Sequence, residues 1–126
     1  FSFDSGVRPK EFRIPNNQIN KRAYACRNDQ VFFLGGQDTV GKRATRLCEI
    51  FDFNKWKFEE IAPMNYPRVY SSPVIVDNQK ERESNSTLWV FGGYNKMSNC
   101  ISYLTSFEKY DATHNEWIIV KLNCGQ

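Results

Sequence analysis

Short apolar runs, separated by turn-forming residues, recur along the chain. They are rich in β-branched and aromatic side chains and are bounded by Gly, Pro, Asn, Asp or Ser, which is typical of β-strands. No long stretch combines a helical apolar period with helix caps, so the pattern predicts essentially no helix. The sequence therefore predicts an all-β fold.

The predicted strands form two successive units, each with one pair of adjacent glycines. In the first unit the expected strands are 22–26, 31–34, 47–53 and 56–61. In the second unit they are 68–72 continuing into 74–76, 88–91, 104–110 and 117–122. Phe3-Asp4 and Phe12–Ile14 are expected to belong to the tail of an earlier unit. The expected organisation is the end of a preceding unit over 1–21, one unit over 22–67 and a second over 68–126.

Both glycine pairs, Gly35-Gly36 and Gly92-Gly93, end an apolar strand. Adjacent glycines at such a place indicate a positive φ or a backbone that passes too close for a Cβ. A phosphate-binding loop would need further glycines and a helix start, and neither pair is followed by them. The pairs are therefore interpreted as structural.

An aromatic–Asp pair and a tryptophan follow each glycine pair, as Phe51-Asp52 with Trp56 and as Tyr110-Asp111 with Trp117. Asp stabilises tight turns by accepting hydrogen bonds from its own backbone, so each Asp is expected to start a turn into a last strand. The turn that ends at Trp56 is expected to be two residues shorter than the turn that ends at Trp117. Burying a Trp stabilises the fold only if a neighbouring sheet covers it, so the sheets must repeat.

The run Asp77–Thr87 contains no apolar residue. Such a run cannot offset the entropy of its own ordering, so it is expected to be a mobile surface loop inserted into the second unit.

The net charge is +3, and much of the basic excess lies in the first half of the chain. It includes Lys42, Arg43 and Arg46, which follow the first glycine pair. Two interpretations stay open: a patch that attracts an acidic peptide or nucleic acid, and a solvated loop, which is favoured. No aromatic residue interleaves with this cluster, so no nucleic acid partner is expected.

The four cysteines, Cys26, Cys48, Cys100 and Cys124, fit no zinc-finger spacing. Cys26 and Cys48 lie in predicted strands and are expected to act as small buried hydrophobic residues. Two disulfides in a secreted protein stay open, because residues 85–87 form a glycosylation sequon. A reducing compartment is favoured.

His114 is the only histidine, and it lies in the turn before Trp117. No partner residues with a recognisable pattern accompany it, so no catalytic or metal site is predicted. Glu59 and Glu60 point to opposite faces of a predicted strand and cannot act as a carboxylate pair. The apolar runs are too short for a transmembrane helix, so no membrane partner is expected.

The order of these residues resembles the kelch repeat, in which a strand ending in Gly-Gly precedes an aromatic–Asp turn, a Trp and an Arg that opens the next unit. The residues that match are Arg22, Gly35, Gly36, Asp52, Trp56, Arg68, Gly92, Gly93, Asp111 and Trp117. The resemblance covers about residues 20–126. It implies a kelch-type β-propeller segment with four-stranded antiparallel blades. Propellers have roughly four to eight blades, so this segment is an incomplete ring that other blades or chains complete.

For function, the resemblance implies a non-enzymatic protein–protein interaction module without a cofactor. It would serve in the cytoplasm as a scaffold, a cytoskeletal binder or a substrate-receptor domain of the ubiquitin-ligase adaptor type. Family ligands are held just after the double glycine and near the Arg that opens each blade. In this chain those positions are Gln37, Asp38, Tyr94, Asn95, Tyr24 and Tyr70.

Two alternatives stay open. Tyr24 and Tyr70 are also suited to packing between blades. The chain is also compatible with a fragment of a kelch-type enzyme, such as a galactose-oxidase-like copper oxidase or a sialic-acid mutarotase. A copper oxidase needs several His and Tyr ligands, and the single histidine argues against such a site in this segment.

Overall fold

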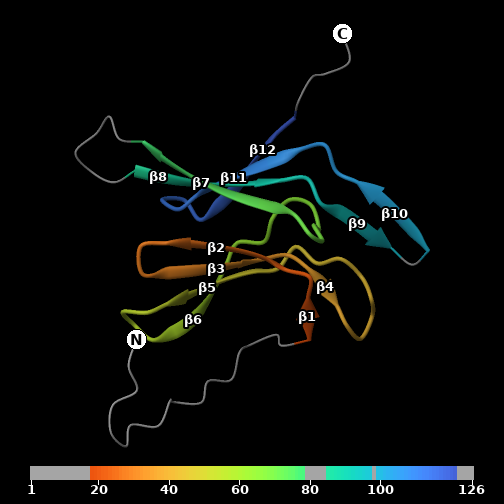
Figure 1. Ribbon diagram of the computed structural model, residues 1–126, viewed down its shortest axis with the longest axis horizontal. Helices are drawn as coiled ribbons and strands as arrows, with labels where there is room; N and C mark the ends of the chain where they lie inside the picture. The colour runs from red at the N-terminus through yellow and green to blue at the C-terminus, as the bar shows by residue number, and fades with distance from the viewer. Residues whose placement is uncertain (1–17, 79–84, 98, 122–126) are drawn as a thin grey trace, which may run out of the picture.

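The computed structural model describes residues 18–78, 85–97 and 99–121, and every regular element in these ranges is a β-strand (Figure 1). The strands are β1 (Ile19–Asn20), β2 (Ala23–Arg27), β3 (Gln30–Leu34), β4 (Gln37–Asp38), β5 (Cys48–Asp52), β6 (Lys57–Ile61), β7 (Ser72–Asn78), β8 (Asn85–Phe91), β9 (Tyr94–Met97), β10 (Cys100–Tyr103), β11 (Phe107–Asp111) and β12 (Glu116–Val120). The described ranges hold no helix that could span a membrane. The expected all-β fold is confirmed.

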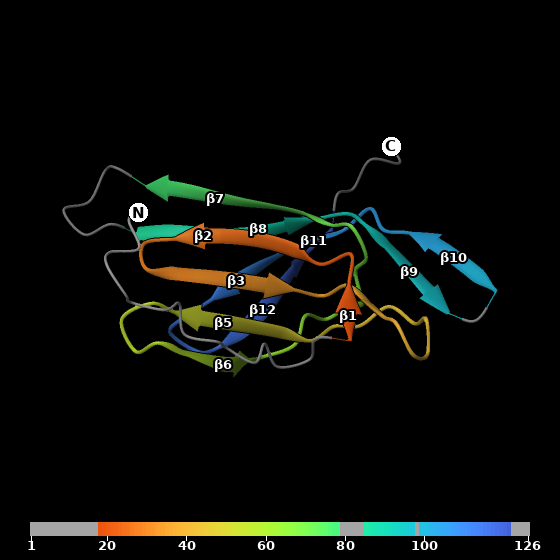
Figure 2. The same cartoon turned by 60° about the horizontal axis from the view of Figure 1, so that its bottom comes forward.

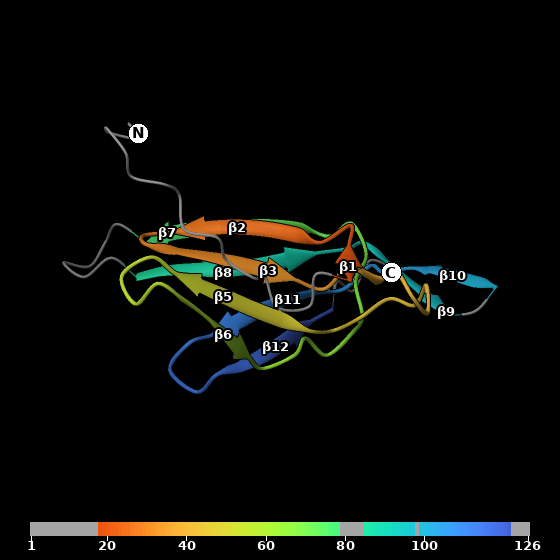
Figure 3. The same cartoon turned by 90° about the horizontal axis from the view of Figure 1, so that it is seen from below.

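Eight of the strands form two four-stranded antiparallel sheets. The first sheet has the order β2-β3-β5-β6, and the second has the order β7-β8-β11-β12. The sheets lie one above the other in Figure 1, and β2 runs beside β7 in Figure 2. The remaining strands form two ribbons, β1 with β4 and β9 with β10, at the same end of both sheets (Figure 3). The two sheets have the four-stranded antiparallel form expected of propeller blades.

The core lies between the sheets because each one turns an apolar face toward the other. On β3 of the first sheet, Phe32 and Leu34 are fully buried. On β8 of the second sheet, Leu88 and Val90 are buried in the same cluster. The ring of Phe32 packs edge-on against the ring of Tyr110, at 6.2 Å between centroids. The alternation of side chains along each strand therefore supplies the surface that joins the two sheets.

The segment that leads from the first sheet to the second is tied to the second sheet. Trp117 on β12 donates from its indole Nε1 to the carbonyl of Ala62 at 2.8 Å. The amide of Ala62 in turn donates to Asn115 Oδ1 at 2.9 Å. Trp117 is buried, and its ring lies 5.0 Å from that of Tyr110. Trp117 also belongs to the buried cluster that contains Phe32 and Ile61 of the first sheet, so the neighbouring sheet covers it as expected.

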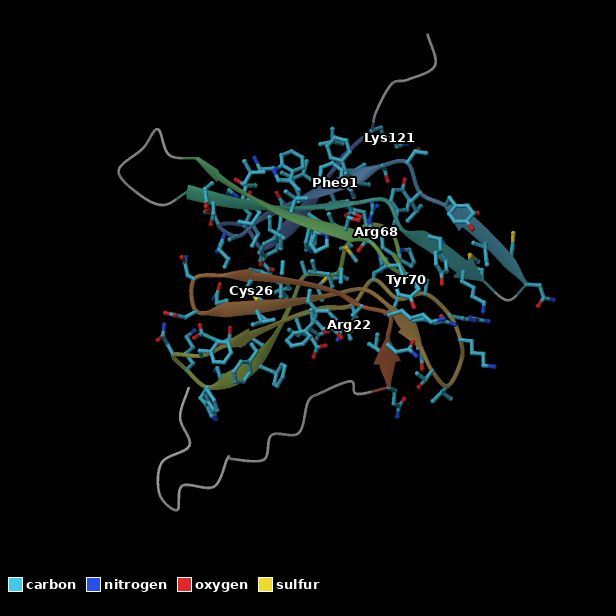
Figure 4. The ribbon with its side chains drawn as sticks, viewed as in Figure 1. Arg22, Cys26, Arg68, Tyr70, Phe91 and Lys121 are labelled. Atoms are coloured by element: carbon cyan, nitrogen blue, oxygen red, sulfur yellow. The ribbon has the colours of Figure 1, made fainter. Side chains whose placement is uncertain are left out.

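The two sheets use opposite faces for this contact. Leu34 and Phe91 each stand directly before a glycine pair, so Phe32 and Leu34 correspond to Trp89 and Phe91. Phe32 and Leu34 are buried against the second sheet. Trp89 and Phe91 instead lie on the outer face of the second sheet, where Phe91 is 38% exposed (Figure 4). The outer face of the second sheet thus corresponds to the buried face of the first.

The converse holds for the outer face of the first sheet. Val31 and Phe33 on that face correspond to Leu88 and Val90, which are buried between the sheets. Each sheet therefore has two dissimilar apolar faces, and the contact joins one face of each kind. Such a head-to-tail contact can be repeated on either side of the pair.

Strand pairing corrects the expected equivalence of the two tryptophans. Phe51 pairs with Phe58 in the first sheet, and Tyr110 pairs with Trp117 in the second. The residue that matches Trp117 is therefore Phe58 and not Trp56. Trp56 lies in the turn before β6, with φ of 55° and 44% exposure. The alignment of Trp with Trp is wrong because Trp56 takes the left-handed turn position that Asn115 holds in the second sheet, with φ of 49°.

The expected difference in turn length is also wrong. Asp52 pairs with Lys57 and Asp111 pairs with Glu116, so the two turns have the same length. In both turns the Asp Oδ1 accepts two backbone N–H groups, from Asn54 and Lys55 in the first. In the second turn the backbone N–H groups of Thr113 and His114 donate to Asp111 Oδ1. The Asp residues therefore start the turns as expected.

The two arginines that open the units occupy different backbone positions. Ala23 pairs with Leu34, and Ser72 pairs with Phe91, so β2 and β7 begin at equivalent residues. Arg22 directly precedes β2, whereas Arg68 lies three residues before Ser71, which directly precedes β7. The expected strand 68–72 therefore begins only at Ser72.

Three further expectations need correction. The predicted loop 77–87 is shorter, since β7 extends to Asn78 and β8 begins at Asn85; residues 79–84 lie outside the described residues. The expected strand 104–110 begins only at Phe107, and the hairpin of β9 and β10, which was not predicted, precedes it. Cys26 was expected to be buried but is exposed, because it lies on the outer face of an edge strand. The expectations for Phe3-Asp4, Phe12–Ile14, Leu122 and Cys124 fall outside the described residues.

Candidate functional site

The glycine pairs fix how the chain passes from each sheet to its ribbon. All four glycines have positive φ. A Cβ on Gly35 would lie 2.5 Å from the carbonyl oxygen of Arg68, and a Cβ on Gly93 would lie 2.7 Å from that of Val69. The amide of Gly36 donates to the same Arg68 carbonyl at 2.8 Å. At these positions a Cβ would collide with backbone, so glycine lets the first pair lie directly against Arg68, which opens the second unit, and lets Gly93 lie against Val69.

A buried arginine, Arg68, lies where the start of the second unit packs against the first glycine pair. The Nε of Arg68 lies 3.0 Å from Glu108 Oε2, and both side chains are fully buried. Nη1 of Arg68 donates to the carbonyls of Gly92 and Ser106 at 2.9 Å each. Glu108 Oε1 also accepts the amide of Asn65 at 2.7 Å, on the segment that joins the two sheets. This network positions the second glycine pair, and with it β9, relative to the first sheet.

The ribbon end of the molecule, formed by β1, β4, β9 and β10, carries a row of three tyrosines. Tyr94 starts β9 and lies between Tyr70 and Tyr103, with 6.2 Å between ring centroids on each side. Tyr70 is 61% exposed and Tyr103 is 80% exposed, and Figure 4 shows Tyr70 at this end. The backbone of Tyr94 pairs with Val69 through two hydrogen bonds, so the row is fixed to the start of the second unit. We call these residues the tyrosine row.

A hollow of about 290 Å³ lies beside this row, where the two ribbons meet. Its lining comes from both repeats and consists of Asn20, Lys21, Gln37, Thr39, Lys42 and Lys96. The Nζ of Lys21 also lies over the ring of Tyr70, 5.8 Å from its centroid. We call this feature the lysine hollow. It brings three cations together beside exposed aromatic rings.

The structure brings only some of the predicted partner-binding residues together. Tyr70 and Tyr94 belong to the tyrosine row, and Gln37 lines the lysine hollow. The carboxylate of Asp38 forms a hydrogen bond within its own loop, where Oδ1 accepts the amide of Val40 at 2.9 Å. Asn95 follows Tyr94 on β9 and is half-buried.

Tyr24 is not part of this group. It lies on β2 of the first sheet, where its ring packs edge-on against Phe33 at 5.4 Å. Tyr70 lies in the connection before β7 with φ of 56°, a backbone position that Lys21 holds in the first repeat. The two tyrosines follow their arginines at the same distance in the sequence but occupy different places in the fold. Tyr24 lies on the sheet face expected to pack between blades, and Tyr70 lies at the ribbon end.

The comparisons with known proteins agree with this architecture. The family model described as Kelch motif matches residues 83–121, which include most of the second sheet and the β9–β10 ribbon. Human Kelch-like protein 23 is 34% identical over 92 residues, which are 73% of this chain and 13% of that protein. An F-box/kelch-repeat protein from Arabidopsis thaliana is 27% identical over 105 residues, which are 82% of this chain and 27% of that protein.

The chain belongs to the kelch-repeat family. The solved structure of YjhT superposes with a TM-score of 0.60 at 20% identity, covering 82% of this chain and 27% of that one. This likeness shows the fold, which is that of a kelch propeller segment. The chain spans only 13% of the human relative and 27% of the plant relative.

His114 lies in the turn at the opposite end of this kelch segment. Its Nδ1 lies 2.7 Å from Asp111 Oδ2, and this hydrogen bond raises the pKa of His114 and lowers the pKa of Asp111. The donor atoms of Asp111, His114 and Glu116 lie within 4.8 Å of one another, so the group has ligands suited to a metal ion. Two of its three side chains are exposed, and both Asp111 oxygens already take part in the turn.

The cysteines do not form a reactive cluster in the described part of the kelch segment. Cys26, Cys48 and Cys100 are free thiols. Cys48 is fully buried on β5, and burial raises the pKa of its thiol to about 12. Cys48 is therefore a neutral core residue, as the sequence predicted.

Sequence reasoning missed the lysine hollow and Tyr103. Lys42 was noted as part of a basic loop, but Lys21 and Lys96 are far from it in the sequence. Their positions relative to the motif could have indicated both lysines. Lys21 directly precedes Arg22, and Lys96 follows the second glycine pair by three residues.

Proposed function

We propose that this chain is part of a kelch β-propeller that acts as a non-enzymatic protein-binding module. The observation that carries the proposal is the tyrosine row, because large exposed aromatic rings fixed on a rigid backbone are the residues that dominate protein interfaces. Tyr103 is the most exposed large side chain of the row, at 80%. Nothing in the fold of the described residues covers it.

Further blades are the proposed neighbours of the two outer sheet faces. The outer face of the second sheet presents Trp89, Phe91 and Phe107, whose rings pack on one another. The equivalent face of the first sheet is buried by the second sheet. A blade placed on each outer face in the same way would bury these rings, and repeating that step leads to a closed ring. The unit boundaries at residues 22 and 68 are part of this proposal.

The finer form of the proposal is a scaffold, a cytoskeletal binder or a substrate receptor of the ubiquitin-ligase adaptor type in the cytoplasm. The names of the relatives, Kelch-like protein 23 and an F-box/kelch-repeat protein, support the adaptor type over the other two. In that role the ribbon end binds the substrate protein. The cofactor-free character of the module is part of the same proposal.

The experiment that tests the proposal compares three variants of the full-length protein. Tyr103→Ala and Tyr94→Ala remove rings from the tyrosine row, and Phe53→Ala removes a half-exposed ring from the turn at the other end. Affinity purification with quantitative mass spectrometry of the co-purified proteins should show the same partners lost from both tyrosine variants and retained by Phe53→Ala. Partners unaffected by both tyrosine variants would contradict the proposal. Stoichiometric copper in the purified protein would favour the enzymatic alternative.

A further inference from the structure

We infer that the lysine hollow binds an acidic peptide segment of a protein partner, with the tyrosine row holding an apolar or aromatic side chain of the same segment. This inference deepens the proposed function and rests on it. It names the chemistry of the partner, which neither the kelch motif nor the names of the relatives specify.

The charge of the lysine hollow supports an anionic ligand. Lys21, Lys42 and Lys96 supply three cations to its lining, and the other three lining residues are neutral and polar. The lining contains no acidic residue. The neighbouring residue Asp38 lines a different hollow together with Arg43, and its Oδ1 accepts the amide of Val40 within its own loop. Three lysines around one hollow supply positive charge that would attract a carboxylate.

The size and lining of the hollow favour a peptide over other anions. A volume of about 290 Å³ corresponds to about ten water molecules at about 30 Å³ each, enough for a carboxylate side chain with adjoining backbone. Small-molecule sites are lined mostly by apolar residues, whereas every residue that lines this hollow has a polar or charged side chain. A nucleic acid needs a basic track along several phosphates, whereas Arg43, the neighbouring cation, lies on the separate surface with Asp38.

The surroundings of the hollow fit the remainder of such a segment. Lys21 links the two features directly, because its ammonium lies over the Tyr70 ring. Beyond Tyr70 the row continues to Tyr94 and Tyr103, and Met97 on the same ribbon is 64% exposed. An acidic residue in the hollow would therefore place its neighbours in the peptide on an aromatic and apolar surface.

The backbone at two of the lysines allows a clean test. Lys21 and Lys42 both have φ of 55°, a left-handed conformation that Asn adopts more readily than other non-glycine residues. The double variant Lys21→Asn/Lys42→Asn therefore removes two positive charges without straining the backbone at either position. The matched control is Lys55→Asn with Lys57→Gln, which removes two exposed lysines from the turn and strand at the other end.

The experiment selects binders for the full-length protein from a random dodecapeptide library displayed on phage. Selected peptides should be enriched in Asp and Glu over the starting library. Their Kd should rise about tenfold in the Lys21→Asn/Lys42→Asn variant, stay unchanged in the control, and rise with added salt. A twenty-residue oligo(dT) should bind more weakly than the selected peptides.

The inference is overturned by selected peptides without acidic enrichment, or by acidic peptides that bind the two double variants equally. It is also overturned by oligo(dT) that binds more tightly than the peptides. Non-acidic peptides that lose affinity in Tyr103→Ala would end the inference and leave the proposed function standing. A selection that yields no peptide at all would count against both.

Discussion

Arg68 and Glu108 form a fully buried ion pair in the second blade, with Nε 3.0 Å from Oε2. Arg22 and Glu49 form the matching pair in the first blade at 2.8 Å. Glu49 and Glu108 are equivalent, since each is the second residue of its strand, β5 or β11. The arginines reach these carboxylates from backbone positions that differ by three residues. The fold thus keeps the ion pair while the sequence position of the cation changes.

Replacing Arg68 by Ala should destabilise the protein strongly. The change leaves the carboxylate of Glu108 buried and without its cation, which typically costs about 3–5 kcal/mol. Urea denaturation of the full-length protein measures this loss as a lower midpoint. The control is Lys55→Ala, which removes an exposed ion pair with Glu59 and should leave the midpoint unchanged. Equal midpoints for both variants would show that the buried Arg68–Glu108 pair does not stabilise the fold.

The two glycines of the second pair should differ in their tolerance of a side chain. A Cβ on Gly92 would meet only Leu104 O, at 3.6 Å, so Gly92→Ala should cost about 1–2 kcal/mol for its left-handed backbone. A Cβ on Gly93 would lie 2.7 Å from Val69 O and 3.1 Å from Ser71 N. Gly93→Ala should therefore destabilise more than Gly92→Ala, and Gly93→Val more still. Thermal unfolding of the three variants gives this order, and a reversed order would refute the close approach of Gly93 to the segment before β7.

The His114–Asp111 pair should add a pH-dependent contribution to stability. The hydrogen bond to Asp111 raises the pKa of His114 above its usual 6.5, so this contribution is complete below pH 6.5 and is lost as the pH rises through the raised pKa. The same bond lowers the pKa of Asp111 below its usual 3.8, so the contribution is also lost as the pH falls through that lowered value.

The measurement compares the wild type with His114→Gln. Between pH 5.5 and pH 8.5, the unfolding midpoint of the wild type should fall relative to that of the variant. The effect should be small, because the His114 side chain is 70% exposed. A difference between the two proteins that does not change with pH would show that the pair does not form in solution.

The fold could be predicted from the sequence because the strand signals and glycine pairs are local. Each strand follows from alternation and turn residues, and Asp52 and Asp111 start their turns as expected. The alignment of Trp56 with Trp117 failed because a large aromatic residue is rare at a left-handed turn position. Asn is common there, and the second turn has Asn115 at this position. Strand register, which only pairing reveals, assigned Phe58 to the place of Trp117.

The candidate site was less accessible to sequence reasoning because it depends on contacts between repeats. Tyr70 and Tyr94 stand beside motif residues in the sequence and could be proposed from it, but Tyr103 lies on a hairpin that the sequence pattern did not predict. Lys21 and Lys96 come from different repeats and meet only when the two ribbons lie side by side. Such convergence leaves no periodic signal in a single sequence.

The outer sheet faces make the cysteines direct reporters of neighbouring blades. Cys26, labelled in Figure 4, lies on β2 of the first sheet. Strand pairing places it in one row with Val31, Phe51 and Phe58 on the outer face of that sheet. Cys48 is buried between the sheets, and Cys100 is exposed on β10 at the ribbon end. A blade that covers the first sheet would bury Cys26 and leave Cys100 accessible.

Iodoacetamide labelling of the native full-length protein, read by mass spectrometry of peptides that contain each cysteine, tests this claim most directly. Rapid labelling of Cys100 with protection of both Cys48 and Cys26 is the predicted result. Labelling of Cys26 as fast as that of Cys100, with Cys48 still protected, would contradict the account, because the outer face of the first sheet would then be open to solvent.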